Sequence, residues 1–500
     1  MSASQPKLVL AVIDAMSPVM LERAIDQGVA PMLGLLRDSG HYVADCVAAF
    51  PSVTPVCAAS IVTGAGQDEH LIPAMNWFHR DEHRYVEYGS SFRSAQRFGI
   101  TRQLTDTVYN MNRAHLSAET PTVFEALDDA GVRTAGTTYL MYRGRYRHEP
   151  QRDTALTRVA SSLMRHPVMG PRELFYADIF ASRRTGCRSG LGMPGVRDRH
   201  AGCVSSYLVE HDLFDFLLLS LPDNDWYSHK RGPEAQVQSL AQADLQLARV
   251  MSAAGGPEEF LRDHAMVVMA DHSQVAVTDT IALQDALAEL GVLGPVRSSE
   301  SSYEGEPRIA VCPSQRAAMV YALHRAERDA MRASVVSLAL ALAGIDLVIW
   351  LERDAHERPR EGVISSHERG ELRFSPDGPL IDLRGATWNV EGALEVLGVS
   401  VQDGRLLSPD YPDALARVWS ALICPSSGEV LLSATEGYEF IDWGRQAHVG
   451  GGSHGSLHAS DSLGALILAG VALPDPAPEQ WAIRDLAPIM LAHFGLEEQR

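Results

Sequence analysis

The sequence predicts an α/β fold: a parallel sheet with helices on both faces, joined to an inserted α+β cap subdomain. Four short apolar runs have the pattern of strands buried on both faces, and they cover residues 8–13, 214–220, 265–270 and 465–469. Helix-like patterns lie between them, at 122–130 and 236–251. Because strand-like and helix-like segments alternate along the chain, a parallel sheet is favoured over an antiparallel one.

The segment 291–445 differs from the rest of the chain. It contains short strand-like runs within 308–321, a helix-like stretch at 326–343 and many turns marked by Pro, Gly and Asp. A chain of 500 residues exceeds the usual size of one hydrophobic core. We therefore expect residues 1–290 and 446–500 to form the core, with 291–445 inserted as a cap over the site.

The charge balance excludes several classes of partner. The 63 acidic residues outnumber the 43 Lys and Arg, and the formal net charge of −20 opposes binding to a nucleic-acid polymer. No stretch reaches the roughly 18 to 20 apolar residues that a membrane span needs, so no membrane partner is expected. A small anionic substrate is compatible with this charge, because bound metal ions reverse the local field.

The six cysteines are too few and too widely spaced for a disulfide framework. Reduced thiols in a cytosolic protein are the simplest interpretation of this pattern. The first apolar run is too short for a secretory signal, and it ends at an aspartate without a cleavage site. We therefore expect a soluble cytoplasmic protein, as a monomer or a homodimer.

Acidic and histidine residues gather at the ends of the apolar runs. Those that follow the first three runs are Asp14, then Asp225 and His229, then Asp271 and His272. In parallel sheets the functional loops lie beyond the carboxyl ends of the strands, so we expect these side chains to meet. The last run is an exception, because His454 and His458 precede it.

A hydroxyl-bearing helix start lies between the first two acidic segments. In Pro-Ser-Val-Thr54-Pro55, the threonine is expected as the N-cap and the proline as the first helical residue. An anion is favoured there, at the positive end of the helix dipole. Each of these segments is weak evidence alone. Together they provide three carboxylates, three histidines and one hydroxyl, enough for two adjacent divalent sites that support phosphoryl transfer.

These motifs resemble those of the alkaline phosphatase superfamily, and most closely its type I phosphodiesterase/nucleotide pyrophosphatase branch. The order of the motifs is that of the family, and together they span the core of the chain. The matching residues are Asp14, Thr54, Gly64, His70, Ile72, Asn76, Asp225, His229, Gly232, Pro233, Asp271, His272, His454 and Gly455.

The resemblance implies two divalent metal ions, zinc in the first place, with manganese or iron as alternatives. One site would use Asp225, His229 and His454. The other would use Asp14, Asp271 and His272, with Thr54 touching the metals. Thr54 would be the nucleophile that forms a covalent phospho-threonine, and Asn76 would donate to a substrate oxygen.

Several positions depart from the family pattern. Leu71 replaces a glycine, and Cys57 stands where the branch usually has an asparagine. Asn76 lies one residue further from the nucleophile than in the family pattern, so whether its side chain points at the substrate is an open question. A turn residue is the alternative for Asn76, and His458 is the alternative to His454 as a metal ligand.

Two further groups have simpler interpretations than substrate or metal binding. The arginines at 143, 145 and 147 could grip a phosphate, but a solvated loop is the commoner case. Asp223 does not fit the Asp-x-x-x-His spacing, so we expect a supporting or structural role for it.

The predicted function is hydrolysis of a phosphodiester or pyrophosphate bond in a small, nucleotide-like phosphate ester. A phosphomonoesterase or a phosphonate hydrolase is the alternative on the same core. A sulfatase is disfavoured because the Cys/Ser-x-Pro-x-Arg setting of its nucleophile is missing. A non-catalytic metal-binding or ligand-binding protein is the remaining alternative.

Overall fold

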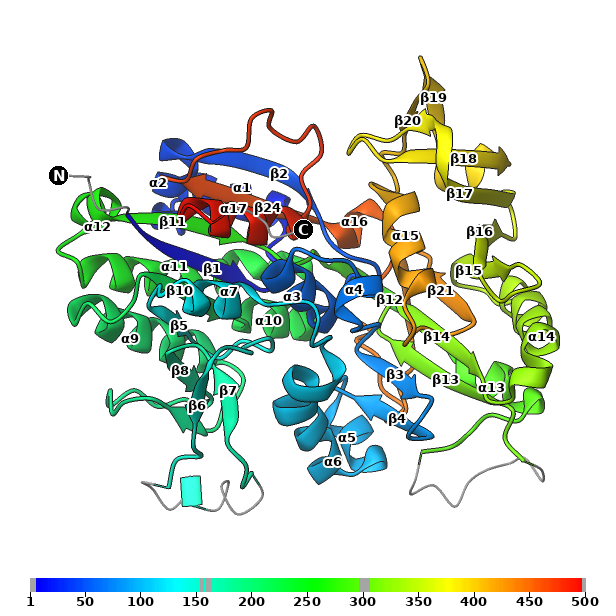
Figure 1. Cartoon of the computed structure of the whole chain (residues 1–500), viewed down its shortest axis with the longest axis horizontal. Coiled ribbons are helices and arrows are strands. Elements are labelled where there is room, and N and C mark those ends of the chain that lie inside the picture. The colour runs from blue at the N-terminus through cyan, green and yellow to red at the C-terminus, as the bar shows by residue number, and fades with distance from the viewer. Residues whose placement is uncertain (1–5, 153–156, 159–163, 296–305, 497–500) are drawn as a thin grey trace.

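The computed structural model describes residues 6–152, 157–158, 164–295 and 306–496 of the chain (Figure 1). Its centre is a largely parallel sheet with helices on both faces, which confirms the predicted α/β class. Across this sheet the strands follow the order β2 (His41–Val47), β24 (Leu463–Ala469), β11 (His264–Met269), β1 (Lys7–Ile13), β10 (Phe216–Leu221), β5 (Thr134–Gly136), β8 (Glu173–Tyr176) and β9 (Phe180–Ala181).

Two groups of helices cover the faces of the sheet and explain why β1 is apolar throughout. Alternate residues of β1 belong to two separate hydrophobic cores, with Leu10 in one and Ala11 in the other. One core is completed by α1 (Pro18–Asp26), α2 (Pro31–Ser39), α9 (Arg197–Glu210), α11 (Gln236–Ser252) and α12 (Pro257–Asp263). The other is completed by α3 (Thr54–Thr63), α7 (Val123–Asp129) and α17 (Leu486–His493).

One strand runs against the predicted direction. The apolar pattern of 465–469 indicated another parallel strand, but β24 is antiparallel to both β11 and β2. This direction places the start of β24 at the edge where β1, β10 and β11 end. It explains why histidines precede this strand, whereas acidic residues follow the others.

A second sheet of nine strands lies beside the core (Figure 1). Its order is β13 (Ile309–Ser314), β14 (Ala317–Ala322), β21 (Val430–Ala434), β15 (Ile345–Arg353), β16 (Pro359–Ser366), β17 (Gly370–Ile381), β20 (Arg405–Leu407) and β19 (Ser400–Gln402), with β18 (Thr387–Gly392) paired to β17. Helices α14 (Arg328–Leu340) and α15 (Ala414–Ile423) pack against its two faces. All its strands fall within the expected insertion 291–445, whose boundaries stay a prediction.

Shorter elements connect the two sheets and surround the site. Strand β12 (Val275–Ile281) pairs with β22 (Gly437–Phe440) and with β23 (Gly452–Ser453). The other short elements used below are α4 (Gln67–His70), β3 (Asn76–His79), β4 (Arg84–Glu87), α10 (Asp223–Arg231), α13 (Leu283–Ala286) and α16 (Ala459–Ser462). Within the described ranges, no helix has both the length and the apolar character that crossing a bilayer requires.

The expectation that all six cysteines are reduced is wrong for one pair. Cys187 and Cys203 form a disulfide that ties a surface loop to α9. Sequence spacing gave no sign of it, because the partners are brought together by tertiary structure.

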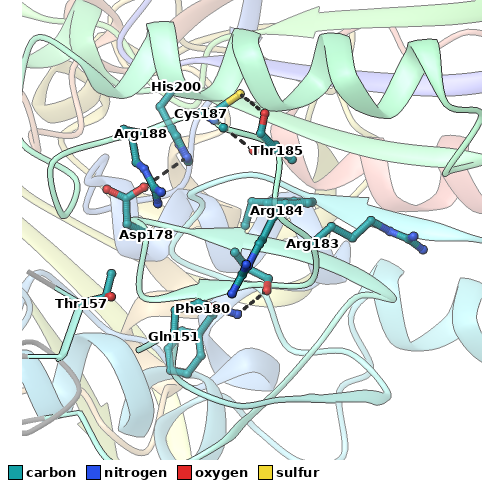
Figure 2. A pocket seen from close by; sticks show the side chains of 13 residues that line it. Gln151, Thr157, Asp178, Phe180, Arg183, Arg184, Thr185, Cys187, Arg188 and His200 are labelled. Atoms are coloured by element: carbon teal, nitrogen blue, oxygen red, sulfur yellow. Dashed lines mark hydrogen bonds and ion pairs between the residues drawn. The ribbon is translucent and has the colours of Figure 1, made fainter. Parts of the chain in front are cut away.

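Beside this loop is a pocket where Asp178 approaches His200, with 3.7 Å between carboxylate oxygen and ring nitrogen (Figure 2). The cytoplasmic location stays a prediction.

Candidate functional site

The candidate metal ligands converge at the carboxyl edge of the central sheet. Asp14 follows β1 directly, Asp225 lies in the first turn of the helix after β10, and Asp271 follows β11. His454 reaches the same edge from the segment before β24, because that strand is antiparallel. The topology therefore gathers residues that lie up to several hundred positions apart in the sequence.

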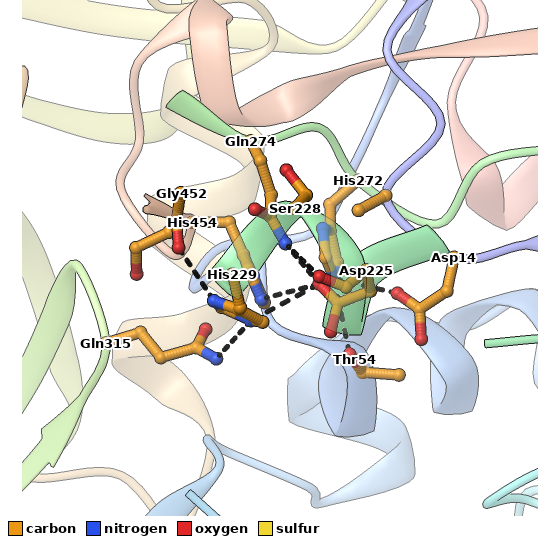
Figure 3. Close-up of polar contacts among 12 residues, drawn as sticks. Asp14, Thr54, Asp225, Ser228, His229, His272, Gln274, Gln315, Gly452 and His454 are labelled. Carbon is orange, nitrogen blue, oxygen red and sulfur yellow. Dashed lines mark hydrogen bonds and ion pairs between the residues drawn. The ribbon is translucent and has the colours of Figure 1, made fainter. Parts of the chain in front are cut away.

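The ligand atoms form two overlapping groups (Figure 3). In each group the nitrogen and oxygen atoms lie within 4.8 Å of one another, and the groups are Asp225, His272 and His454, and Asp14, Asp271 and His272. His272 is shared by both. His229 adjoins the first group, with its Nε2 atom 3.3 Å from Asp225 Oδ1. His454 Nε2 lies 3.5 Å from the same oxygen.

Backbone carbonyls orient all three histidines in the same way. His229 Nδ1 contacts the Gly452 carbonyl at 2.7 Å, and His454 Nδ1 contacts the Ser52 carbonyl at 2.7 Å. His272 Nδ1 lies 3.1 Å from the carbonyl of the next residue. A carbonyl oxygen only accepts, so each Nδ1 carries the hydrogen. Each Nε2 lone pair is therefore directed into the cluster, which is the orientation that metal-binding histidines adopt.

The electrostatics of the cluster also fit a cation. Burial, followed by the charges of Asp271 and Asp225, raises the pKa of Asp14 well above its usual value. Burial lowers the pKa of His454 well below its usual value, which keeps the ring neutral. Among the described residues, Asp14 Oδ1 and His454 Nε2 have no hydrogen-bond partner. Buried polar atoms are seldom left unpaired, so the donor set fits divalent ions.

Thr54 lies beside this cluster, at the start of a buried helix. Its Oγ1 atom is 3.3 Å from His272 Nε2. The structure moves the expected N-cap by one residue: Val53, with an extended backbone, caps α3, and Thr54 is already helical. Pro55 accordingly occupies the second helical position. The Thr54 side chain is therefore not the cap, and it faces the cluster through its contact with His272.

The three positions that depart from the family pattern, Cys57, Leu71 and Asn76, each have a distinct structural environment. Cys57 is fully buried, and burial raises the pKa of its thiol well above the usual value, so it stays neutral. Leu71 has a left-handed backbone with φ of 68°, a conformation that favours glycine. Asn76 is buried, and its side-chain NH2 donates to the Val86 carbonyl at 3.0 Å and to Glu87 Oε2 at 3.2 Å. Its predicted role toward substrate stays a prediction.

Other residues that the sequence singled out lie outside the cluster. His458 contacts Glu436 at 3.3 Å and packs its ring against Tyr411. Asp223 accepts from the Gly195 amide and from the Arg197 guanidinium, both at 2.8 Å, which is a structural role.

The arginine cluster is likewise engaged in structural contacts. Arg143 pairs with Glu125 at 2.9 Å and donates to three backbone carbonyls. Arg147 pairs with Glu149 at 2.8 Å. Arg143 thus ties neighbouring loop backbone together, whereas Arg147 forms an exposed pair within its own segment.

Two glutamines in the site escaped the sequence analysis. Gln274 donates to the Asp225 carboxylate. It lies two residues after His272, so its position next to a ligand motif was a usable signal. Gln315 lies at the tip of the β13–β14 hairpin, and its Nε2 atom is 3.4 Å from His229 Nε2. Because it comes from the nine-stranded sheet, nothing in its sequence surroundings connects it with the site.

Comparison with known families agrees with this geometry. A model described as type I phosphodiesterase/nucleotide pyrophosphatase matches residues 8–358. The chain belongs to this family. It is therefore a hydrolase, from a family that acts on phosphodiester and pyrophosphate bonds. No curated protein matches the sequence.

Solved structures of similar fold align with almost the whole chain. Phosphonoacetate hydrolase from Sinorhizobium meliloti 1021, in complex with phosphonoformate, is 17% identical, with a TM-score of 0.56 and coverage of 98% of this chain and 96% of that one. An inactive variant of murine ectonucleotide pyrophosphatase/phosphodiesterase 5, in complex with AMP, is 11% identical, with a TM-score of 0.58 and coverage of 99% and 96%. At these identities the likeness concerns the fold.

Proposed function

We propose that this protein is a divalent-metal-dependent hydrolase of phosphodiester or pyrophosphate bonds in a small, nucleotide-like substrate. Thr54 is the proposed nucleophile, through a covalent phospho-threonine. The observation that carries this proposal is the 3.3 Å contact of Thr54 Oγ1 with His272, the residue shared by the two candidate metal groups. A single hydroxyl beside two such groups is the arrangement that a covalent phosphoryl transfer requires.

The first proposed metal site consists of Asp225, His229 and His454, and the second of Asp14, Asp271 and His272. Neutral imidazoles and carboxylates suit zinc first, and manganese or iron as alternatives. When bound, two such ions would lower the pKa of the Thr54 hydroxyl and neutralise charge on the phosphoryl oxygens.

The residues of the chain position the reaction. The buried α3 helix fixes Thr54 at its start, and the positive end of its dipole favours an anionic phosphoryl group there. Thr54 Oγ1 attacks phosphorus in line, and the bond from phosphorus to the leaving oxygen breaks as the new bond forms. The Thr54 hydroxyl loses its proton to solvent as it attacks, and the leaving oxygen takes up a proton from solvent in exchange. Water then attacks the phospho-threonine, which releases phosphate or a phosphate ester and restores Thr54.

A second candidate, phosphonate hydrolysis, has specific support. The phosphonoacetate hydrolase fold covers 98% of this chain, and that protein was solved with phosphonoacetate as well as with phosphonoformate. The same cluster could attack phosphorus with carbon rather than oxygen as the leaving atom. We rank the phosphodiesterase first because the family match covers residues 8–358.

The test compares three substrates: bis-p-nitrophenyl phosphate, p-nitrophenyl phosphate and phosphonoacetate, with zinc-loaded or manganese-loaded protein. Faster diester cleavage that Thr54→Ala abolishes, while metal content is unchanged, would support the first candidate. Acid-quenched mass spectrometry should show an adduct on Thr54. Preference for the monoester or for phosphonoacetate would move the protein to the corresponding alternative. Equal turnover by Thr54→Ala would refute the nucleophile.

A further inference from the structure

The tip of the β13–β14 hairpin brings Gln315 to the candidate metal ligands (Figure 3). Ser314 pairs with Ala317, so Gln315 and Arg316 form a two-residue turn. Gln315 has φ of 62°, a left-handed conformation that glycine adopts without strain and other residues rarely adopt. A non-glycine residue held in this conformation beside the candidate ligands is a reason to ask what its side chain does there.

The backbone of this tip is held on both sides. The Gln315 carbonyl accepts from the Phe440 amide at 2.9 Å, and the Arg316 amide donates to the His454 carbonyl at 2.9 Å. The Arg316 side chain is fully buried and pairs with the buried Asp461 carboxylate. The backbone of Gln315 is therefore fixed relative to His454, a proposed metal ligand.

The amide of Gln315 has no adequate partner in the protein. Its Nε2 atom lies 3.4 Å from His229 Nε2, and its Oε1 atom is buried with no hydrogen-bond partner among the described residues. A metal ion on His229 would take up the Nε2 lone pair and leave the Gln315 NH2 group without its acceptor. The NH2 group would then need another acceptor, and an anionic oxygen of a ligand could supply it.

Asn76, the residue that the resemblance assigns to substrate binding, has committed its donors elsewhere. Its NH2 group has two hydrogens, and it contacts two acceptors, Val86 O and Glu87 Oε2. A flipped amide would direct Oδ1 at the Val86 carbonyl, which cannot donate. The Asn76 backbone amide also donates to Ser314 Oγ at 3.1 Å, which places this strand against the residue before Gln315.

We propose that Gln315, rather than Asn76, donates the side-chain hydrogen bond to a non-bridging phosphoryl oxygen of the ligand. This inference rests on the proposed function, because it places the phosphoryl group beside His229. It makes the inserted segment part of the substrate site, not only its cover. The expected ligand class is a phosphoryl group with a free anionic oxygen.

The experiment compares Gln315→Ala and the size-conserving Gln315→Glu with Gln284→Ala. Gln284 is the control: it is a buried glutamine that donates to the Ile441 carbonyl at 2.9 Å and lies on α13, outside the cluster. Three quantities are measured on zinc-loaded protein. They are bound metal, the Kd for inorganic phosphate by calorimetry, and kcat and KM for bis-p-nitrophenyl phosphate.

Both Gln315 variants should keep the metal content of the wild type but bind phosphate about 10- to 100-fold more weakly, as expected for a lost hydrogen bond to a charged oxygen. The loss should appear in kcat/KM as well, and Gln284→Ala should change neither. Wild-type phosphate affinity in Gln315→Ala, or loss of metal from it, would overturn the proposal. If the wild type failed to hydrolyse any substrate, the proposed function would fall, and phosphate binding would still decide the role of Gln315.

Discussion

His70 should make the stability of this protein depend on pH in a predictable direction. It is fully buried at the end of α4, and burial lowers its pKa to about 3. Its Nδ1 atom accepts from the Ile72 amide at 3.1 Å, so the hydrogen is on Nε2, which donates to Ser60 Oγ at 3.2 Å. Because Ser60 belongs to α3, this neutral ring braces the helix that begins at Thr54.

The magnitude follows from linkage. A histidine whose folded pKa is depressed stabilises the fold above its unfolded pKa of about 6.5, and this stability is lost as pH falls toward the folded pKa. Each pH unit below 6.5 should therefore cost about 1.4 kcal/mol. Between pH 7.5 and pH 5.5 the contribution of His70 should fall by about 1.4 kcal/mol, because its folded pKa of about 3 lies below both values.

The assay is urea unfolding of metal-free wild-type protein and of His70→Asn at pH 7.5 and pH 5.5. The asparagine Oδ1 can still accept from the Ile72 amide, but the side chain does not titrate in this range. The variant should be less stable at pH 7.5, and the difference from wild type should shrink by about 1.4 kcal/mol at pH 5.5. An equal difference at both pH values would refute the buried neutral ring. Taking the difference cancels the titration of the other histidines.

Four further outcomes are expected. Leu71→Gly should raise the free energy of unfolding in urea by about 0.5 kcal/mol, since relief of the left-handed strain exceeds the entropy cost of glycine. Arg316→Met should cost about 3 to 5 kcal/mol in the same assay by leaving Asp461 buried and unpaired, and adding Asp461→Asn should recover part of it. EDTA should lower the calorimetric unfolding midpoint, and zinc should restore it; no change would contradict a bound metal. Replacing Cys187 by serine should cost about 3 kcal/mol under non-reducing conditions and nothing after reduction of the wild type.

The strands of the central sheet, and the acidic residues at their ends, could be predicted because both depend on local patterns. Asp14 and Asp271 follow apolar runs directly, and the sheet topology alone brings such positions to one edge. The same logic failed for the direction of β24, because an apolar run of this length fits a parallel or an antiparallel strand equally well. His454 was assigned from its motif, and the antiparallel strand supplies the physical reason for its place.

The remaining features depend on contacts between distant segments. The nine-stranded sheet is assembled from strands of very different length, and only its first strands and one helix had recognisable patterns. Cys187 and Cys203 become partners through the packing of a loop on α9. Gln315 lies in a two-residue turn whose sequence, Gln-Arg, lacks the glycine or asparagine that marks such turns. No local signal could have placed it beside His229.

The candidate ligands on the central sheet and Gln315 on the nine-stranded sheet suggest a division of tasks within the protein. The proposed metal ligands and Thr54 lie on the core and are held by its backbone, as the contacts of His229 and His454 with carbonyls illustrate. A side-chain change at Gln315, in the nine-stranded sheet, can alter the hydrogen bonds offered to substrate while the backbone contact of this hairpin with His454 is kept. With the Asn76 donors held within the β3–β4 hairpin, substrate preference should depend on Gln315 and its neighbours. The choice between phosphodiester and phosphonate substrates is therefore best sought in substitutions of the inserted segment rather than of the core.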